Sequence, residues 1–94
     1  MSDASSDPTI QRLRREISDV DRALLQGINA RLALVAELKQ HKDSLGLSFV
    51  DPDRERALLD DLARGNGGPL TEEGVRAFFA DVLELTKREV DRGE

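Results

Sequence analysis

Three cations interrupt the apolar pattern in the first half of this 94-residue sequence. Arg31 falls in a seven-residue repeat whose other members are isoleucine and leucine, and Arg14 and Lys42 fall in a second repeat that includes Ile28 and Val35. Burying an unpaired guanidinium or ammonium group costs several kcal/mol, so each of these cations requires an anion. The pattern predicts a pocket that binds a small anionic molecule.

The carboxylates of the sequence supply only part of the required negative charge. Asp21 lies in the same repeat as Arg14 and Lys42 and can pair with one of them, whereas the other nearby acidic residues fall mostly on other faces: Glu16, Asp19, Glu37 and Asp43. A bound anionic ligand would make up the deficit. The alternative is that Arg14 and Lys42, near the ends of the segment, extend into water and leave only Arg31 to explain.

Helical periodicity sets how the three cations are placed. Apolar residues recur every seven positions, which predicts one helix from roughly residue 9 to 45; they are Ile10, Ile17, Leu24, Leu38 and Leu45. Gly46 stands where a glycine commonly ends a helix. We expect residues 1–8 to form a disordered leader and residues 9–94 to form a single helical domain.

The length of this helix predicts a dimer. It would extend ~54 Å, whereas a compact monomer of this size is roughly 30 Å across, so part of its apolar stripe would stay uncovered. We therefore expect an intertwined homodimer in which two long helices pack together. Arg31 and Lys42 share a face ~16 Å apart, but Arg14 lies ~25 Å from Arg31 along the same helix. In an antiparallel dimer, one ligand can meet Arg31 and Lys42 of one chain and Arg14 of the other.

Two shorter helices follow the long one. The first is predicted to begin at Asp51-Pro52 and to end at Gly65, and the second to begin after Thr71 and run to the C-terminus. No segment alternates between apolar and polar residues with a period of two. The predicted fold class is therefore all-α, with one long, one short and one medium helix in each chain.

Polar residues on the two shorter helices are further site candidates. Arg54 and Glu55 share faces with the leucines of the second helix, and Thr86 lies on the apolar face of the third, one turn before Val90. Ordinary capping of a helix start also accounts for the turn at Asp51. A buried threonine commonly bonds to a carbonyl of its own helix, so both interpretations remain open.

The composition excludes several classes of protein. A net charge of −5 argues against a nucleic-acid binder, and the lack of cysteine excludes disulfides and thiolate chemistry. A chain that is 35% charged is too polar for a membrane span, and its first ten residues show no secretory signal. We therefore expect a cytoplasmic protein.

Taken together, the motifs resemble those of the all-helical, AroQ-type chorismate mutases. The resemblance runs from Ile10 onward and rests on a set of residues at matching intervals: Leu13-Arg14-Arg15-Glu16-Ile17, Asp21, Leu24-Leu25, Arg31, Lys42 and Asp51-Pro52-Asp53-Arg54-Glu55. It implies an intertwined homodimer that rearranges chorismate to prephenate in the shikimate pathway, with no metal, cofactor or covalent intermediate.

The resemblance also implies roles for the candidate residues. Arg14 from the partner subunit and Lys42 would bind the enolpyruvyl carboxylate, and Lys42 would also face the ether oxygen. Arg31 would bind the ring carboxylate. For that same carboxylate the resemblance implies Thr86 as a further ligand.

On the second helix, Arg54 would lie near the ring carboxylate. Glu55 and the first turn at Asp51 would hold the ring hydroxyl.

One position departs from the family pattern. Family members usually place Gln or Glu four residues after the small hydroxyl residue, to donate to the ether oxygen, and this chain has Val90 there. The chain is then a slow mutase, a mutase for a related substrate, or an enzyme that needs a partner protein to reshape the last helix. A shift of the alignment by one residue would instead supply Glu89.

Other functions remain open beside chorismate mutase. A mutase of 4-amino-4-deoxychorismate would place an ammonium group near Asp51 and Glu55, and an isochorismate-pyruvate lyase uses a similar set of cations. A non-catalytic helical dimerisation or regulatory module is the alternative from a different class. Such a module would favour Asn, or no polar residue, where this chain has Arg31 and Lys42.

Overall fold

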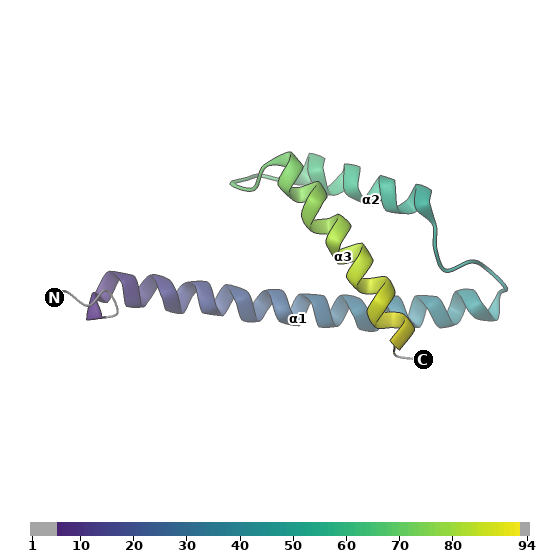
Figure 1. The fold of residues 1–94 in the computed structure, drawn as a ribbon, viewed down its shortest axis with the longest axis horizontal. Helices are drawn as coiled ribbons and strands as arrows, with labels where there is room; N and C mark the ends of the chain where they lie inside the picture. The colour runs from purple at the N-terminus through teal and green to yellow at the C-terminus, as the bar shows by residue number, and fades with distance from the viewer. Residues whose placement is uncertain (1–5, 93–94) are drawn as a thin grey trace. The chain divides into compact units, whose positions relative to one another are not determined.

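The chain folds into three α-helices in a computed structural model that describes residues 6–92 (Figure 1). Helix α1 spans Pro8–Ser44, α2 spans Pro52–Gly65 and α3 spans Glu72–Arg92, and residues 6–92 contain no strand. The predicted all-α class, with one long, one short and one medium helix, is confirmed.

Local sequence signals account for where the helices begin and end. The side chain of Asp51 accepts a hydrogen bond from the backbone nitrogen of Arg54 at 3.1 Å, and Pro52 begins α2 directly after it. Thr71 caps α3 in the same way, accepting from the nitrogen of Gly74 at 2.9 Å. Gly46 has a positive φ of 71°, a conformation that glycine adopts without steric cost, and it follows the end of α1.

The start of α1 has a cap that the sequence analysis did not identify. The side chain of Asp7 accepts from the backbone nitrogens of Thr9 at 2.9 Å and Ile10 at 3.0 Å, and Pro8 opens the helix. This is the same Asp-Pro arrangement as at α2. Of the predicted leader, residues 1–5 lie outside the described residues.

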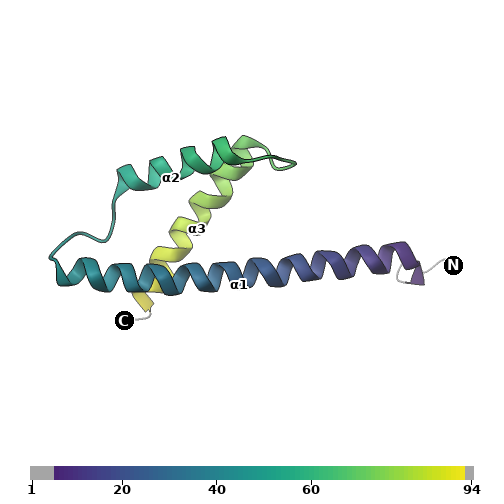
Figure 2. The ribbon, with the colours of Figure 1, turned by 180° about the vertical axis from the view of Figure 1, so that it is seen from behind.

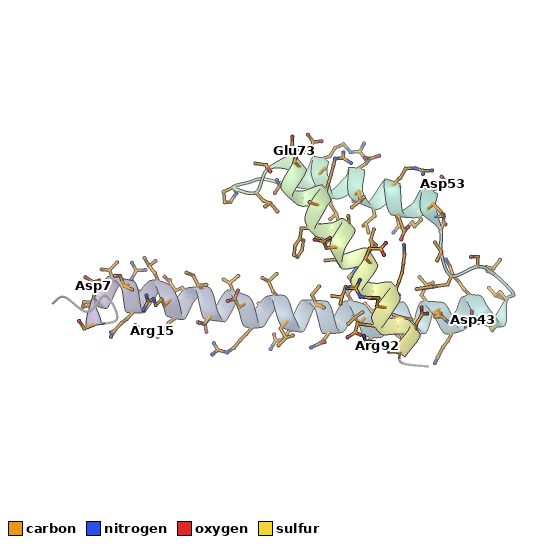
Figure 3. All side chains as sticks on the ribbon, viewed as in Figure 1. Asp7, Arg15, Asp43, Asp53, Glu73 and Arg92 are labelled. Atoms are coloured by element: carbon orange, nitrogen blue, oxygen red, sulfur yellow. The ribbon has the colours of Figure 1, made fainter. Side chains whose placement is uncertain are left out.

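The chain divides into two units, Met1–Ala33 and Leu34–Glu94, and the described part of the first consists of Ser6, Asp7 and a single stretch of α1. Its apolar side chains are open to solvent: Ile17 is 59% exposed and Leu24 is 53% exposed. Figure 3 shows side chains standing out from both sides of this stretch around Asp7 and Arg15. No residue of α1 is buried.

The second unit contains the end of α1 together with α2 and α3. Helices α2 and α3 meet at the loop 66–71 and form an antiparallel pair (Figures 1 and 2). Their early residues Asp53 and Glu73 lie at opposite ends of the pair (Figure 3). The core of this unit lies along one face of α3, on Val75, Val82, Thr86 and Val90.

None of the described helices is both long enough and apolar enough to cross a membrane.

Candidate active site

Lys42 is held against the loop that leads from α1 to α2. It lies in the last turn of α1 and is half-buried, and its Nζ donates a hydrogen bond to the carbonyl oxygen of Phe49 at 3.3 Å. One turn earlier, Lys39 pairs with Asp43 at 3.2 Å and lies 6.0 Å from the centre of the Phe49 ring. The cation at position 42 is therefore positioned by contacts within its own chain.

The first turn of α2 presents three of the predicted residues in different settings. Asp51 is exposed and its carboxylate caps the helix, as the alternative interpretation of this turn proposed. Arg54 is also exposed. Glu55 is half-buried, and its Oε1 lies 2.9 Å from Nζ of Lys87 on α3. Glu55 is therefore the member of this turn that faces the neighbouring helix.

On α3, Thr86 and Val90 occupy consecutive turns of the buried face. Thr86 is 5% exposed, and its Oγ1 donates a hydrogen bond to the carbonyl oxygen of Val82 at 2.7 Å, the alternative bond that the sequence analysis left open. Val90 is 6% exposed. Glu89 instead accepts a hydrogen bond from Arg92 of its own helix at 3.4 Å. The residue that continues the face of Thr86 is Val90 and not Glu89.

Arg14 and Arg31 both lie on the stretch of α1 within Met1–Ala33. Arg14 is exposed and, with four neighbours, lines a surface hollow of about 380 Å³ formed by Arg14, Arg15, Ser18, Asp19 and Arg22. Arg31 is half-buried. Because they are about 25 Å apart on one helix, one chain does not bring the two arginines to one small ligand.

Lys87 is the charged residue near the site that the sequence analysis did not identify. It is 32 residues from Glu55 in the sequence, and only the packing of α3 on α2 brings them together. The hydrogen bond to Glu55 raises the pKa of Lys87, against the opposing effect of partial burial. Lys87 also lies 3.4 Å from Glu84, the residue three positions before it. No pattern within α3 alone indicates that Lys87 faces α2.

Among residues 6–92, no group of three or more histidine and acidic side chains is arranged to hold a metal ion. The chemically useful groups of the second unit are a positioned ammonium group at Lys42, a half-buried carboxylate at Glu55 and a buried hydroxyl at Thr86. Each of these groups can pair with or hydrogen-bond to a polar group of a small molecule.

Comparison with known proteins agrees with this arrangement. Residues 13–90 match the sequence model of the family described as chorismate mutase type II. One similar solved structure is form II of the chorismate mutase from Thermus thermophilus, with a TM-score of 0.85 and 33% identity over 89% of this chain and 96% of that one. Form I of that enzyme gives a TM-score of 0.82 and 35% identity over 83% of this chain and 98% of the other.

The family match includes residues of all three helices, and the chain shares both sequence and fold with the Thermus thermophilus enzyme. The expected all-helical enzyme is confirmed, and a purely structural dimerisation module is disfavoured. The chain belongs to the chorismate mutase type II family.

Proposed function

We propose that this chain rearranges chorismate to prephenate in the cytoplasm, at a site that two copies of the chain build together and without a cofactor. The family match supports the reaction. The main support for a site between two copies is that the apolar side chains of α1 are exposed, such as Ile17 at 59% and Leu24 at 53%. A second α1 would remove this surface from water, which is the main favourable contribution to association.

The second copy would also bring the separated cations together. Arg14 and Arg31 are too far apart on one helix for one small ligand, but antiparallel packing would place Arg14 of the partner subunit near Arg31 and Lys42. Each dimer would then hold two equivalent sites. The exposure of Arg14 on a single chain agrees with a residue whose ligand contacts form only in the assembly.

The chemistry suits a set of fixed cations. In the rearrangement, the C–O bond of the ether breaks while a new C–C bond forms within the same molecule, and no proton is transferred. The substrate is a dicarboxylate that must fold into a chair-like geometry, so clamping its two carboxylates favours reaction by positioning. Negative charge develops on the ether oxygen as the C–O bond breaks, and a fixed cation there stabilises the transition state more than the ground state.

Each cation has a role that suits its shape. Arginine binds carboxylates through two parallel hydrogen bonds, so Arg14 of the second copy would hold the enolpyruvyl carboxylate and Arg31 the ring carboxylate, with Arg54 nearby. Lys42 acts as a point charge and would contact both the enolpyruvyl carboxylate and the ether oxygen. Thr86 would join Arg31 after its hydroxyl turns away from the carbonyl of Val82.

The ring hydroxyl would be held at the first turn of α2. Glu55 is half-buried and accepts hydrogen bonds, so it would accept a hydrogen bond from the hydroxyl group, beside Asp51. Val90 has no donor for the ether oxygen, so Lys42 would act on that atom without the usual second donor. A partner protein that reshapes the end of α3 would be the other source of such a donor, and a higher rate on adding it would reveal this arrangement.

The direct test is to offer chorismate, 4-amino-4-deoxychorismate and isochorismate to the purified protein in parallel and to identify each product. We expect prephenate from chorismate as the fastest reaction. Faster conversion of the amino analogue, or release of pyruvate from isochorismate, would contradict the proposed substrate. Light scattering at micromolar concentration should give the mass of a dimer, and a monomer mass would contradict the shared site.

A second test measures binding alone. A dicarboxylate mimic of the transition state should raise the melting temperature, because a ligand that binds only the folded protein stabilises it. At a hundred times its dissociation constant, the mimic would stabilise the fold by about 2.7 kcal/mol. An unchanged melting temperature at saturating mimic would contradict the anion-binding pocket.

A further inference from the structure

The ion pair between Lys87 and Glu55 joins α3 to the first turn of α2. Nζ of Lys87 lies 2.9 Å from Oε1 and 3.5 Å from Oε2 of Glu55, so the ammonium group is close to both oxygens. The two side chains are 31% and 25% exposed, respectively. A pair that is mostly withdrawn from water is screened less than a surface pair, so its charges act more strongly on any group bound beside it.

A second ion pair links the same two helices and provides a comparison. Arg76 of α3 lies 2.8 Å from Asp60 of α2, and these side chains are 41% and 54% exposed. It is the more exposed of the two pairs and involves no residue of the proposed site. Any effect of α2–α3 pairing on stability should be seen at both pairs, whereas an effect on the ligand should be seen only at Lys87.

Pairing with Lys87 changes which ligand groups Glu55 can accept. A carboxylate has about four lone-pair positions, so Glu55 can bind Lys87 and still accept a hydrogen bond from a neutral hydroxyl. An ammonium group at the same place would be a second cation against a carboxylate whose charge is already compensated. Glu84 also lies 3.4 Å from Lys87, but it is 66% exposed and therefore more strongly screened by water.

We propose that Lys87 determines specificity, because its pairing with Glu55 favours a substrate with a neutral ring hydroxyl over one with an ammonium group at that position. This rests on the proposed function, in which Glu55 holds the ring substituent. It favours chorismate over 4-amino-4-deoxychorismate, two compounds that the family resemblance alone leaves undistinguished. Lys87 acts through Glu55 and is a positioning residue.

The test compares kcat/KM for chorismate and for 4-amino-4-deoxychorismate in five proteins: wild type, Lys87→Met, Lys87→Arg, Arg76→Met and Glu84→Gln. Lys87→Met removes the charge but keeps much of the side-chain length. We expect it to shift the ratio of the two kcat/KM values toward the amino analogue by about tenfold or more, because it removes a like charge a few ångströms from the bound ammonium group. Lys87→Arg should keep the wild-type ratio to within about threefold, because the cation remains.

Arg76→Met is the matched control, since it removes the other ion pair between α3 and α2. It should leave the ratio unchanged even where it lowers the melting temperature. Glu84→Gln should shift the ratio of the two kcat/KM values in the opposite direction, slightly toward chorismate. It removes a carboxylate that competes with Glu55 for the ammonium group of Lys87. These variants separate a charge effect on the substrate from a loss of helix packing.

Three outcomes would overturn the inference. A ratio that changes less than about twofold in Lys87→Met, with chorismate still converted, contradicts the role of Lys87 and leaves the proposed function standing. An equal shift of the ratio in Arg76→Met would show that the effect comes from weaker packing of α3 on α2 and not from the charge of Lys87. A wild-type protein that neither converts nor binds the two compounds, as measured by calorimetry, contradicts the proposed function and the inference together. If it binds both without converting them, the ratio of dissociation constants replaces that of kcat/KM.

Discussion

The ammonium group of Lys42 donates a hydrogen bond to the carbonyl oxygen of Phe49, seven residues further along the chain, at 3.3 Å. This bond ties the last turn of α1 to the loop before α2 and fixes the direction of the cation before any ligand binds. A charge that is already oriented does not have to reorganise as the transition state forms, which is the basis of electrostatic catalysis. Lys42 is therefore positioned for the role proposed at the ether oxygen.

Removing this charge should mainly lower the rate. We expect Lys42→Met to reduce kcat by about a hundredfold to a thousandfold, as for the loss of a donor that acts on developing charge. Lys42→Arg should also lose much of the activity, because a planar guanidinium group does not reproduce a point charge. Lys39→Met, which alters a lysine that contacts the same loop residue, is the control and should keep most of the activity. If Lys39→Met lowered kcat as much as Lys42→Met, the loss would come from a disturbed loop and not from the missing charge of Lys42.

The proposed site between two subunits predicts complementation between two inactive chains. Arg14→Ala and Arg31→Ala should each inactivate the enzyme, but an equal mixture of the two, unfolded and refolded together, should recover activity. In a heterodimer, one of the two sites receives Arg14 from one chain and Arg31 from the other, so about a quarter of the wild-type sites are restored. A mixture that stays inactive while native mass spectrometry shows heterodimers would contradict the site between subunits.

Val90→Gln tests the position at which the family resemblance leads us to expect Gln or Glu. The side chain at position 90 continues the face of Thr86, so an amide there should donate to the ether oxygen and raise kcat on chorismate. Because Val90 is buried, the same substitution should lower the melting temperature in the absence of ligand. Val82→Gln, which buries an amide two turns earlier, should lower the melting temperature without raising the rate. An unchanged or lower rate for Val90→Gln would contradict the assigned role of this position.

Asp51 has two roles that substitutions can separate. Its side chain caps α2, so Asp51→Ala should cost about 1 kcal/mol of stability, measured by urea unfolding. Asn caps a helix about as well as Asp, so Asp51→Asn should keep the stability and remove only the negative charge. If Asp51 also holds the ring hydroxyl, Asp51→Asn should raise KM for chorismate. If Asp51→Asn has the same KM and kcat as the wild type, Asp51 caps α2 and does not hold the ring hydroxyl.

The local features of the fold could be predicted from the sequence because the signals that specify them lie within a few residues. A period of seven in the apolar residues indicated α1, and Asp51-Pro52 and Thr71 marked the starts of α2 and α3. The cap at Asp7 follows the same rule and was missed only because the residues before it read as a leader. The family was also evident from the sequence, since it depends on residue types at fixed spacings.

Contacts between helices required the tertiary structure. The pairing of Lys87 with Glu55 joins residues 32 positions apart, and no local pattern indicates which of several charged residues on α3 will face α2. The sequence analysis left two partners open for the hydroxyl of Thr86, and the structure shows it bonded to the carbonyl oxygen of Val82 on the buried face of α3. The sequence by itself determined the helices, their ends and the family, because hydrogen bonding within a helix is local. Only the packing of α3 on α2 decided which charges meet, because that depends on how two separate helices are rotated against each other.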